Sequence, residues 1–193
     1  MSSLTGHTVH ILSNSDPSTS SFHSSTQAPI TQLAPGVTIS YVYATPPGAH
    51  FSIERSEDLK YHDQNIAAGE PYPAFPGAGG TAAAILEMAA NPNNEPGFMH
   101  RNDTVDYLFV VEGELELGAT SGEVKFVKAG EVVVQRGGNC LSPSVLCTPL
   151  MSHLSAWHSM KNPSKENRLK IVAVNVGAEG AEQGKLFFPK QKA

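Results

Sequence analysis

Short runs of apolar and β-branched residues, separated by glycine-bearing turns, dominate the chain between residues 105 and 135. They read VDYLFVV, ELEL, EVKFV and EVVVQ. Runs this short, joined by tight turns, are typical of antiparallel strands. In ELEL at 114–117 polar and apolar residues alternate, as they do in a sheet with one face in water. The pattern predicts an antiparallel meander over this stretch.

Three further segments have the composition of strands. They read VTISYVYA at 37–44, TAAAILEM at 81–88 and RLKIVAVNVG at 168–177. The chain does not alternate strands with long helices, so a parallel α/β sheet is not expected. We predict an all-β fold, an antiparallel β-barrel or double-sheet jelly roll with one short helical element. That helix is predicted to run from the candidate N-cap Ser56 to about Ala68.

The first 35 residues differ from the rest of the chain. Residues 1–35 are rich in serine and threonine and show no periodicity. This composition buries too little apolar surface to offset the entropy of ordering, so it predicts a flexible N-terminal arm. Residues 36–188 are predicted to form a single domain. Outside the candidate site, surface positions are expected for five histidines: His7, His10, His23, His50 and His62.

Composition and charge exclude several classes of protein. The 193 residues are 40% hydrophobic and 16% charged, which suits one globular domain. A net charge of −5 gives no general attraction to nucleic acid. No apolar run reaches membrane-spanning length and no leader pattern is seen, so a cytoplasmic protein is expected. The only cysteines, Cys140 and Cys147, are predicted to be free thiols.

Residues that can bind a metal or move a proton collect near residue 105. His100, Asn102 and Asp106 are separated by even steps, so one strand would place all three on a single face. His158 is predicted to reach the same place from a neighbouring strand. Two histidines and a carboxylate can form a three-ligand face for one divalent ion (Fe, Mn, Ni or Zn), assisted weakly by Asn102. Without metal, His100 or Asp106 would act as general acid or base.

Four other residues are weaker candidates. Tyr107 is a candidate catalytic or pocket-lining residue, although the strand period turns it away from Asp106. Trp157 is a candidate for lining a pocket for an aromatic substrate, with core packing as its alternative role. Gln135 and Arg136 are candidates for orienting an anionic or phenolic substrate. Arg136, or Arg101, is alternatively the structural ion-pair partner of Asp106.

Residues 140–156 interrupt the pattern with a segment that has no charged residue and no glycine. One interpretation is a loop insertion at the rim of the site, where it would act as a lid. The other is a short in-frame intron translated into protein. If the insertion is genuine, Cys140 takes the approximate place of the histidine in the uninterrupted register. In either case, deleting 140–156 is expected to preserve or raise stability.

The two polar stretches together resemble the two halves of the cupin motif. Residues 96–113, PGFMHRNDTVDYLFVVEG, match H-x-H-x3,4-E-x6-G at His100, Asp106 and Gly113, with asparagine at 102 and aspartate for glutamate. GEVVVQRGGN at 130–139 and WHSMKN at 157–162 together match G-x5-P-x-G-x2-H-x3-N, with Arg136 for proline. MHRNDTVDY and VQRGGN also resemble a fungal cupin subgroup with "HRT…DY" and "VQRGT" motifs.

This resemblance to the cupin (RmlC-like) superfamily covers about half of the chain and implies more about fold than about reaction. It implies a jelly roll, a homodimer paired through sheet edges, and a small-molecule substrate. Cupins include dioxygenases, decarboxylases, isomerases, cyclases, lyases and non-catalytic binders. We expect an enzyme of secondary metabolism acting on a hydrophobic, oxygenated metabolite. The alternatives are a binding barrel with a degenerate metal cup and an inactive product of faulty splicing.

Overall fold

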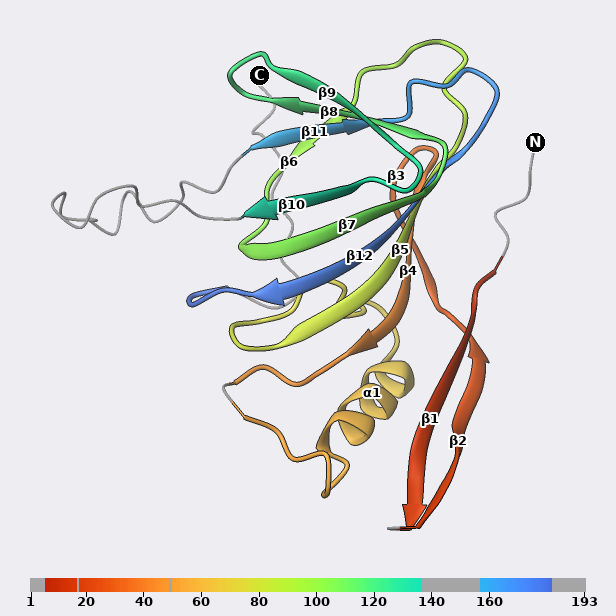
Figure 1. Ribbon diagram of the computed structural model, residues 1–193, viewed down its shortest axis with the longest axis vertical. Coiled ribbons are helices and arrows are strands. Elements are labelled where there is room, and N and C mark those ends of the chain that lie inside the picture. Colours follow the sequence, from red (N-terminus) through yellow and green to blue (C-terminus); the bar gives the residue numbers. More distant parts are fainter. Residues whose placement is uncertain (1–5, 17, 49, 137–156, 182–193) are drawn as a thin grey trace, which may run out of the picture.

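The computed structural model describes residues 6–16, 18–48, 50–136 and 157–181 (Figure 1). Strands dominate it, with a single helix, α1 (Glu57–Ala68), among the described residues. No helix in these ranges is long and apolar enough to cross a membrane. The strands are β1 (Thr8–Asp16), β2 (Thr19–Gln27), β3 (Ile30–Ala34), β4 (Val37–Ala44), β5 (Thr81–Met88), β6 (Phe98–His100), β7 (Thr104–Glu112), β8 (Glu114–Ala119), β9 (Val124–Lys128), β10 (Val132–Arg136), β11 (His158–Lys161) and β12 (Leu169–Gly177).

Two antiparallel sheets make up the body of the protein. The larger has the strand order β10-β7-β12-β5-β4-β3, and the smaller has the order β6-β11-β8-β9. Along β12 every second side chain is buried, which is the alternation expected of a strand with one face on a core. The core contains Leu86, Leu108 and Ile171 from the larger sheet and Leu115 and Met160 from the smaller one. The predicted all-β, double-sheet class is confirmed.

The meander predicted for residues 105–135 is confirmed for the consecutive strands β8 and β9, which pair antiparallel, and is wrong for β7 and β10. β7 pairs with β10 and β12, whereas β8 pairs with β9 and β11 in the other sheet. The chain changes sheets at Gly113, which has a φ of 81°. A Cβ there would lie 2.7 Å from the carbonyl oxygen of Arg168, so this corner requires glycine. Alternation along a strand marks which face is buried and leaves the identity of its neighbour open.

The N-terminal residues also differ from their prediction. Within the predicted flexible arm, β1 and β2 form an antiparallel hairpin and β3 joins the larger sheet. The expectation of no regular structure is therefore wrong for the described part of residues 1–35. Among the contacts that join the hairpin and the residue before it to the body, His7 pairs with Glu87 at 3.3 Å, and His23 pairs with Asp63 at 3.1 Å. The backbone N–H and C=O groups of serine and threonine can pair in a strand ladder, so a serine-rich composition does not exclude a hairpin.

The helix lies where the sequence places it, but it is capped differently. Ser56 has a left-handed backbone (φ 54°) and makes no capping hydrogen bond through its side chain. The first turn is held instead by Glu57, whose carboxylate accepts a hydrogen bond from the backbone N–H of Ser52 at 2.6 Å. The helix lies against β4, and His62 is its buried residue (Figure 1).

His62, on α1, is buried, so the surface position expected for it is wrong. Its ring stacks on those of Tyr41 and Tyr43, at 5.5 and 4.9 Å between centroids. Its Nδ1 lies 3.2 Å from the hydroxyl of Tyr41. Burial lowers the pKa of His62 because the charged imidazolium is poorly solvated there.

This burial predicts a loss of stability in mild acid. A histidine with a lowered folded pKa contributes fully above its unfolded pKa of about 6.5, and the contribution is lost as the pH falls below that value. The melting temperature of the wild-type protein should therefore drop more between about pH 7 and pH 5 than that of His62→Gln. At pH 7 the variant should be less stable by about 1 kcal/mol through the lost ring contacts. Exposed His50→Gln is the control, and equal slopes in all three proteins would contradict the prediction.

Candidate functional site

Two short strands of the smaller sheet bring the candidate histidines together. β6 and β11 pair antiparallel, with His100 opposite His158 and Phe98 opposite Met160. Directly opposite residues in an antiparallel pair project to the same side of the sheet. Both histidines are buried, at 5% and 6% exposure, and Met160 belongs to the core between the sheets. The predicted return of the chain at His158 therefore places this residue beside His100, inside the double sheet.

The two imidazoles are in direct contact. Their Nε2 atoms lie 3.0 Å apart, and the rings meet edge to face with centroids 4.1 Å apart. The Nδ1 of His100 lies 3.4 Å from the backbone oxygen of Phe98, whose ring also stacks on the His100 imidazole at 4.6 Å. Burial, and secondarily the neighbouring His158, lower the pKa of His100 to about 3. His100 is therefore neutral at physiological pH.

A second polar cluster surrounds Asp106. Its carboxylate accepts hydrogen bonds from the Asn102 amide at 2.6 Å, the Thr104 hydroxyl at 2.5 Å and the Gln135 amide at 3.2 Å. Gln135 also donates to the side-chain oxygen of Asn102 at 3.3 Å. Burial raises the pKa of Asp106, and the hydrogen bonds from Thr104 and Asn102 oppose that shift. These four residues form an interior network that we call the Asp106 cluster.

Local register explains how the Asp106 cluster is assembled. Asp106 on β7 lies opposite Gln135 on β10 and opposite Asn175 on β12. Asn175 is also buried and donates to the backbone oxygen of Ala74 at 2.7 Å, which holds the 71–80 loop across this end of the sheets. Three neighbouring strands of the larger sheet thus contribute polar side chains to one region.

The residues predicted as metal ligands divide between the two clusters. His100 and His158 meet, and Asn102 and Asp106 meet, but no group of three His, Cys, Asp or Glu side chains suited to a metal is found among the described residues. The imidazole pair fits a metal well. Two nitrogens at neighbouring positions of an ion, each about 2.1 Å from it, lie about 3 Å apart. The contact of His100 Nδ1 with a carbonyl is also typical of a metal-binding histidine. Asp106 fits less well, because three side chains already use its oxygens.

The weaker candidates lie outside these clusters, apart from Gln135. Tyr107 and Arg136 are exposed on the outer face of the larger sheet, away from Asp106. Arg101 is buried and does not pair with Asp106 as one interpretation held; it contacts Asp103 at 3.3 Å and lies over the Trp157 ring at 5.6 Å. Cys140 and the 140–156 segment are outside the described residues. The contribution of Thr104 was not foreseen, although its even spacing from Asp106 is a usable signal.

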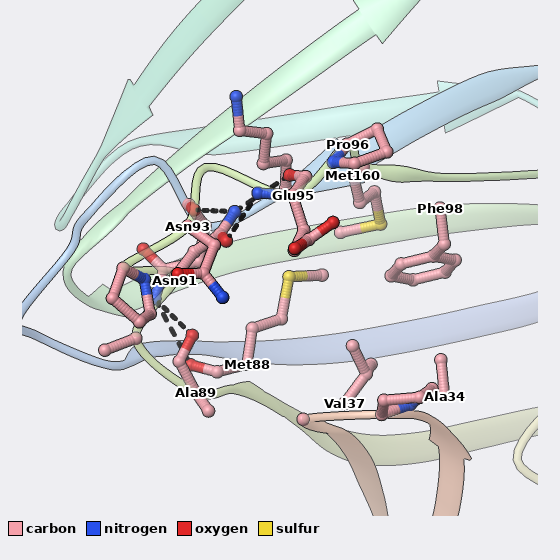
Figure 2. A pocket seen from close by; sticks show the side chains of 17 residues that line it. Ala34, Val37, Met88, Ala89, Asn91, Asn93, Glu95, Pro96, Phe98 and Met160 are labelled. Carbon is pink, nitrogen blue, oxygen red and sulfur yellow. Dashed lines mark hydrogen bonds between the residues drawn. The ribbon is translucent and has the colours of Figure 1, made fainter.

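A pocket of about 610 Å³ is lined by Phe98 and Met160, among others, and does not include either histidine in its lining (Figure 2). Its apolar wall includes Val37, Met88, Phe98 and Met160, which belong to the core or pack against it. Polar residues at its edge are Asn91, Asn93, Glu95 and Lys161. The volume is within the range of small-molecule sites. Phe98 connects the pocket with the histidine pair, since it lines the pocket and its ring stacks on that of His100.

The sequence relatives of this chain are named as proteins of biosynthesis clusters. No family model matches the chain. "Oryzines biosynthesis cluster protein J" of Aspergillus oryzae is 29% identical over 127 residues, covering 66% of this chain and 58% of that protein. "Phomopsin biosynthesis cluster protein C'" of Diaporthe leptostromiformis is 41% identical over 63 residues, 33% of this chain and 32% of that protein. The chain thus spans a third to somewhat over half of the length of these relatives.

Solved structures similar to this chain include cupins. An RmlC-like cupin from Shewanella frigidimarina is 11% identical with a TM-score of 0.42, covering 79% of this chain and 86% of that one. The polyketide cyclase RemF from Streptomyces resistomycificus is 11% identical with a TM-score of 0.44, covering 81% and 73%. The double-sheet architecture given above rests on the strand pairing of this chain itself.

Proposed function

We propose that this chain is a cupin-type enzyme of secondary metabolism that acts on a hydrophobic, oxygenated small molecule. The reaction class is an isomerisation, cyclisation or elimination, or a metal-dependent dioxygenation. The observation that carries the proposal is the buried contact between His100 and His158, with 3.0 Å between their Nε2 atoms. Burying two imidazoles costs solvation that apolar side chains would not lose, so a role for the pair in chemistry is favoured.

The histidine pair is the part of the site best suited to a divalent ion. His100 and His158 would supply two nitrogen ligands, and the Phe98 carbonyl would hold the Nδ1–H of His100 so that its Nε2 lone pair faces the ion. A bound ion would polarise a carbonyl or enolate oxygen, or take part in oxygen chemistry. Asp106 becomes a third ligand only if its carboxylate leaves the hydrogen bonds from Asn102 or Thr104.

The Asp106 cluster is the part best suited to moving a proton. Its raised pKa brings Asp106 closer to neutral pH than an ordinary aspartate, which favours a general acid or base. Asn102 and Gln135 orient the carboxylate by donating to the same oxygen, Oδ2. His100, whose pKa is near 3, does not carry a proton as a cation; it acts as a neutral ligand or hydrogen-bonding group. Tyr107 is left out because it faces away.

Three observations support a small-molecule substrate from secondary metabolism. The 610 Å³ pocket has a size suited to a metabolite. Its wall of methionine, phenylalanine and valine suits apolar groups, and its amide-bearing edge suits oxygen atoms. The sequence relatives are, by their names, proteins of biosynthesis clusters. The pocket and the relatives support the substrate class, and the histidine pair supports the reaction.

The proposal is tested by combining metal analysis with a ligand screen. Purified full-length protein should contain, or take up, one divalent ion per chain by elemental analysis and calorimetry. A panel of oxygenated aromatic and polyketide-type metabolites should then be screened by ligand-observed NMR, with turnover followed by mass spectrometry. Turnover abolished by a chelator and restored by the ion would support metal dependence. Turnover insensitive to chelator would support acid–base chemistry at Asp106.

A non-catalytic binding barrel is the second candidate. The engagement of Asp106 with Asn102, Thr104 and Gln135 favours it, because this carboxylate is held as in a structural network. Saturable binding of a metabolite without turnover, in protein loaded with metal and in protein without it, would support the binding barrel over the enzyme.

A further inference from the structure

One aromatic ring lies between the 610 Å³ pocket and the histidine pair. Phe98 lines the pocket, and its ring stacks on the His100 imidazole with 4.6 Å between centroids and 20° between planes. Neither His100 nor His158 lines the pocket itself. The same side chain thus contacts both the pocket and the imidazole. A molecule in the pocket does not touch either histidine while the Phe98 ring keeps this position.

The backbone at Phe98 is held more firmly than its side chain. Phe98 and Met160 lie opposite each other on β6 and β11, and both line the pocket (Figure 2). The chain just before Phe98 lies close against β11, since a Cβ on Gly97 would be 2.8 Å from the backbone oxygen of Met160. Met160 is 3% exposed, whereas Phe98 is only partly buried and packs against the core. Rotation of the Phe98 side chain would therefore end the stacking without moving the strand.

We propose that Phe98 is the gate between the pocket and the histidine pair, and that the group it admits is a planar, conjugated ring. The space that the Phe98 ring would leave is flat and lies against the imidazole of His100. A planar ring of the ligand would fill this space and restore the stacking, whereas a saturated ring is too thick and has no π-system. The inference rests on the proposed function in taking the pocket as the place where the substrate binds, and it narrows the substrate class to aromatic or conjugated compounds.

Opening the gate would leave the orientation of His100 intact. The Nδ1 atom of His100 lies 3.4 Å from the backbone oxygen of Phe98, a contact in which the Phe98 side chain takes no part. His100 also stays opposite His158 in the pairing of β6 with β11. An aromatic stack changes the ratio of closed to open states by a factor of about 2 to 12. The stack is therefore strong enough to keep the gate mostly closed and weak enough for a ligand ring to replace it.

The first test measures access to His100 in the full-length protein, by modification with diethyl pyrocarbonate in the presence of a chelator and analysis by mass spectrometry. Phe98→Leu, and Phe98→Ala as a second variant, should each raise the rate of modification of His100 by about 5-fold, the effect of losing one aromatic stack. Val37→Ala is the matched control, because it widens the same pocket from β4 in the other sheet and should leave this rate unchanged. The exposed His50 is the internal reference, and circular dichroism checks that each variant is folded.

The second test compares two probes with the same carbon skeleton, naphthol and decahydronaphthol, by NMR of the protein carrying isotope-labelled histidine. Naphthol should bind the wild type at least about 5-fold more tightly than decahydronaphthol does, and it should shift the ring resonances of His100. Decahydronaphthol should leave these resonances in place. Phe98→Leu should bind naphthol more tightly than the wild type, because no ring of the protein then competes for the face of His100.

Three results would overturn the proposal. They are equal modification of His100 in the wild type and in both Phe98 variants, equal acceleration by Val37→Ala, and naphthol that does not bind or leaves the His100 resonances unshifted. Neither test requires a metal ion or turnover. The gate can therefore fail while the proposed reaction stands, and a protein without turnover can still possess the gate.

Discussion

Replacing either His100 or His158 with alanine should abolish binding of a divalent ion and lower any turnover by about 10²- to 10⁴-fold. The two rings come from different strands, and their Nε2 atoms lie 3.0 Å apart. Each variant leaves a single imidazole, which cannot hold an ion in a chelate. The measurement is calorimetry with Zn²⁺, Ni²⁺, Mn²⁺ and Fe²⁺ under anaerobic conditions, with elemental analysis of the purified variants.

Two controls separate this effect from general damage. His50→Ala removes an exposed histidine that is remote in sequence and should bind the ion like the wild type. Asp106→Asn keeps the size of the side chain while removing its charge. If Asp106 stays in its present hydrogen bonds, this variant should weaken ion binding by no more than the 10- to 100-fold typical of a residue beyond the ligands. Complete loss would establish the three-ligand face predicted from the spacing. Undiminished binding and turnover in both histidine variants would remove the pair from the mechanism.

The sequence predicted the elements of this fold better than their arrangement. β-Branched runs located β4 and β12 closely, because such residues favour the pleated conformation wherever the strand lies. The alanine-rich run at 81–88 was also correctly assigned as a strand, β5. The corner at Gly113 and the exchange of partners between the two sheets are tertiary effects. No local pattern distinguishes a strand that pairs with its successor from one that crosses to the opposite sheet. The same reason explains the hairpin of β1 and β2, whose serine-rich residues carry little apolar signal.

The single strand predicted to carry His100, Asn102 and Asp106 is wrong, because His100 ends β6, Asn102 lies between the two strands and Asp106 is on β7 in the other sheet. Asn102 still contacts Asp106, and the rejoined second motif correctly brought His158 to a strand beside His100. The separation of these residues into an imidazole pair and a carboxylate cluster was not predicted. It depends on how Thr104 and Gln135 hold Asp106, and therefore on hydrogen-bond geometry across β7 and β10. Whether this separation persists when a ligand binds is what the Asp106→Asn variant measures.

The last residue of the second motif, Asn162, has a different role from the histidine four positions before it. It is buried, and its amide nitrogen donates to the backbone oxygens of Ala89 and Asn167, at 2.9 and 2.8 Å, and more weakly to that of Met88 at 3.3 Å. Its side-chain oxygen accepts from the backbone N–H of Ser164 at 3.0 Å. One side chain thus ties the end of β5 to the loop between β11 and β12.

Asn162→Asp should therefore destabilise the protein strongly, although the two side chains have nearly the same size. The variant keeps the acceptor for Ser164 but replaces the donor with an oxygen that faces backbone carbonyl oxygens. Leaving buried carbonyls without a donor costs about 1–3 kcal/mol, and a buried unpaired carboxylate adds to that, so a total loss of about 3–5 kcal/mol is expected. Urea denaturation measures it, with Asn93→Asp at the exposed edge of the pocket as the control. If Asn162→Asp were as stable as the control, the network around Asn162 would not hold the two segments together.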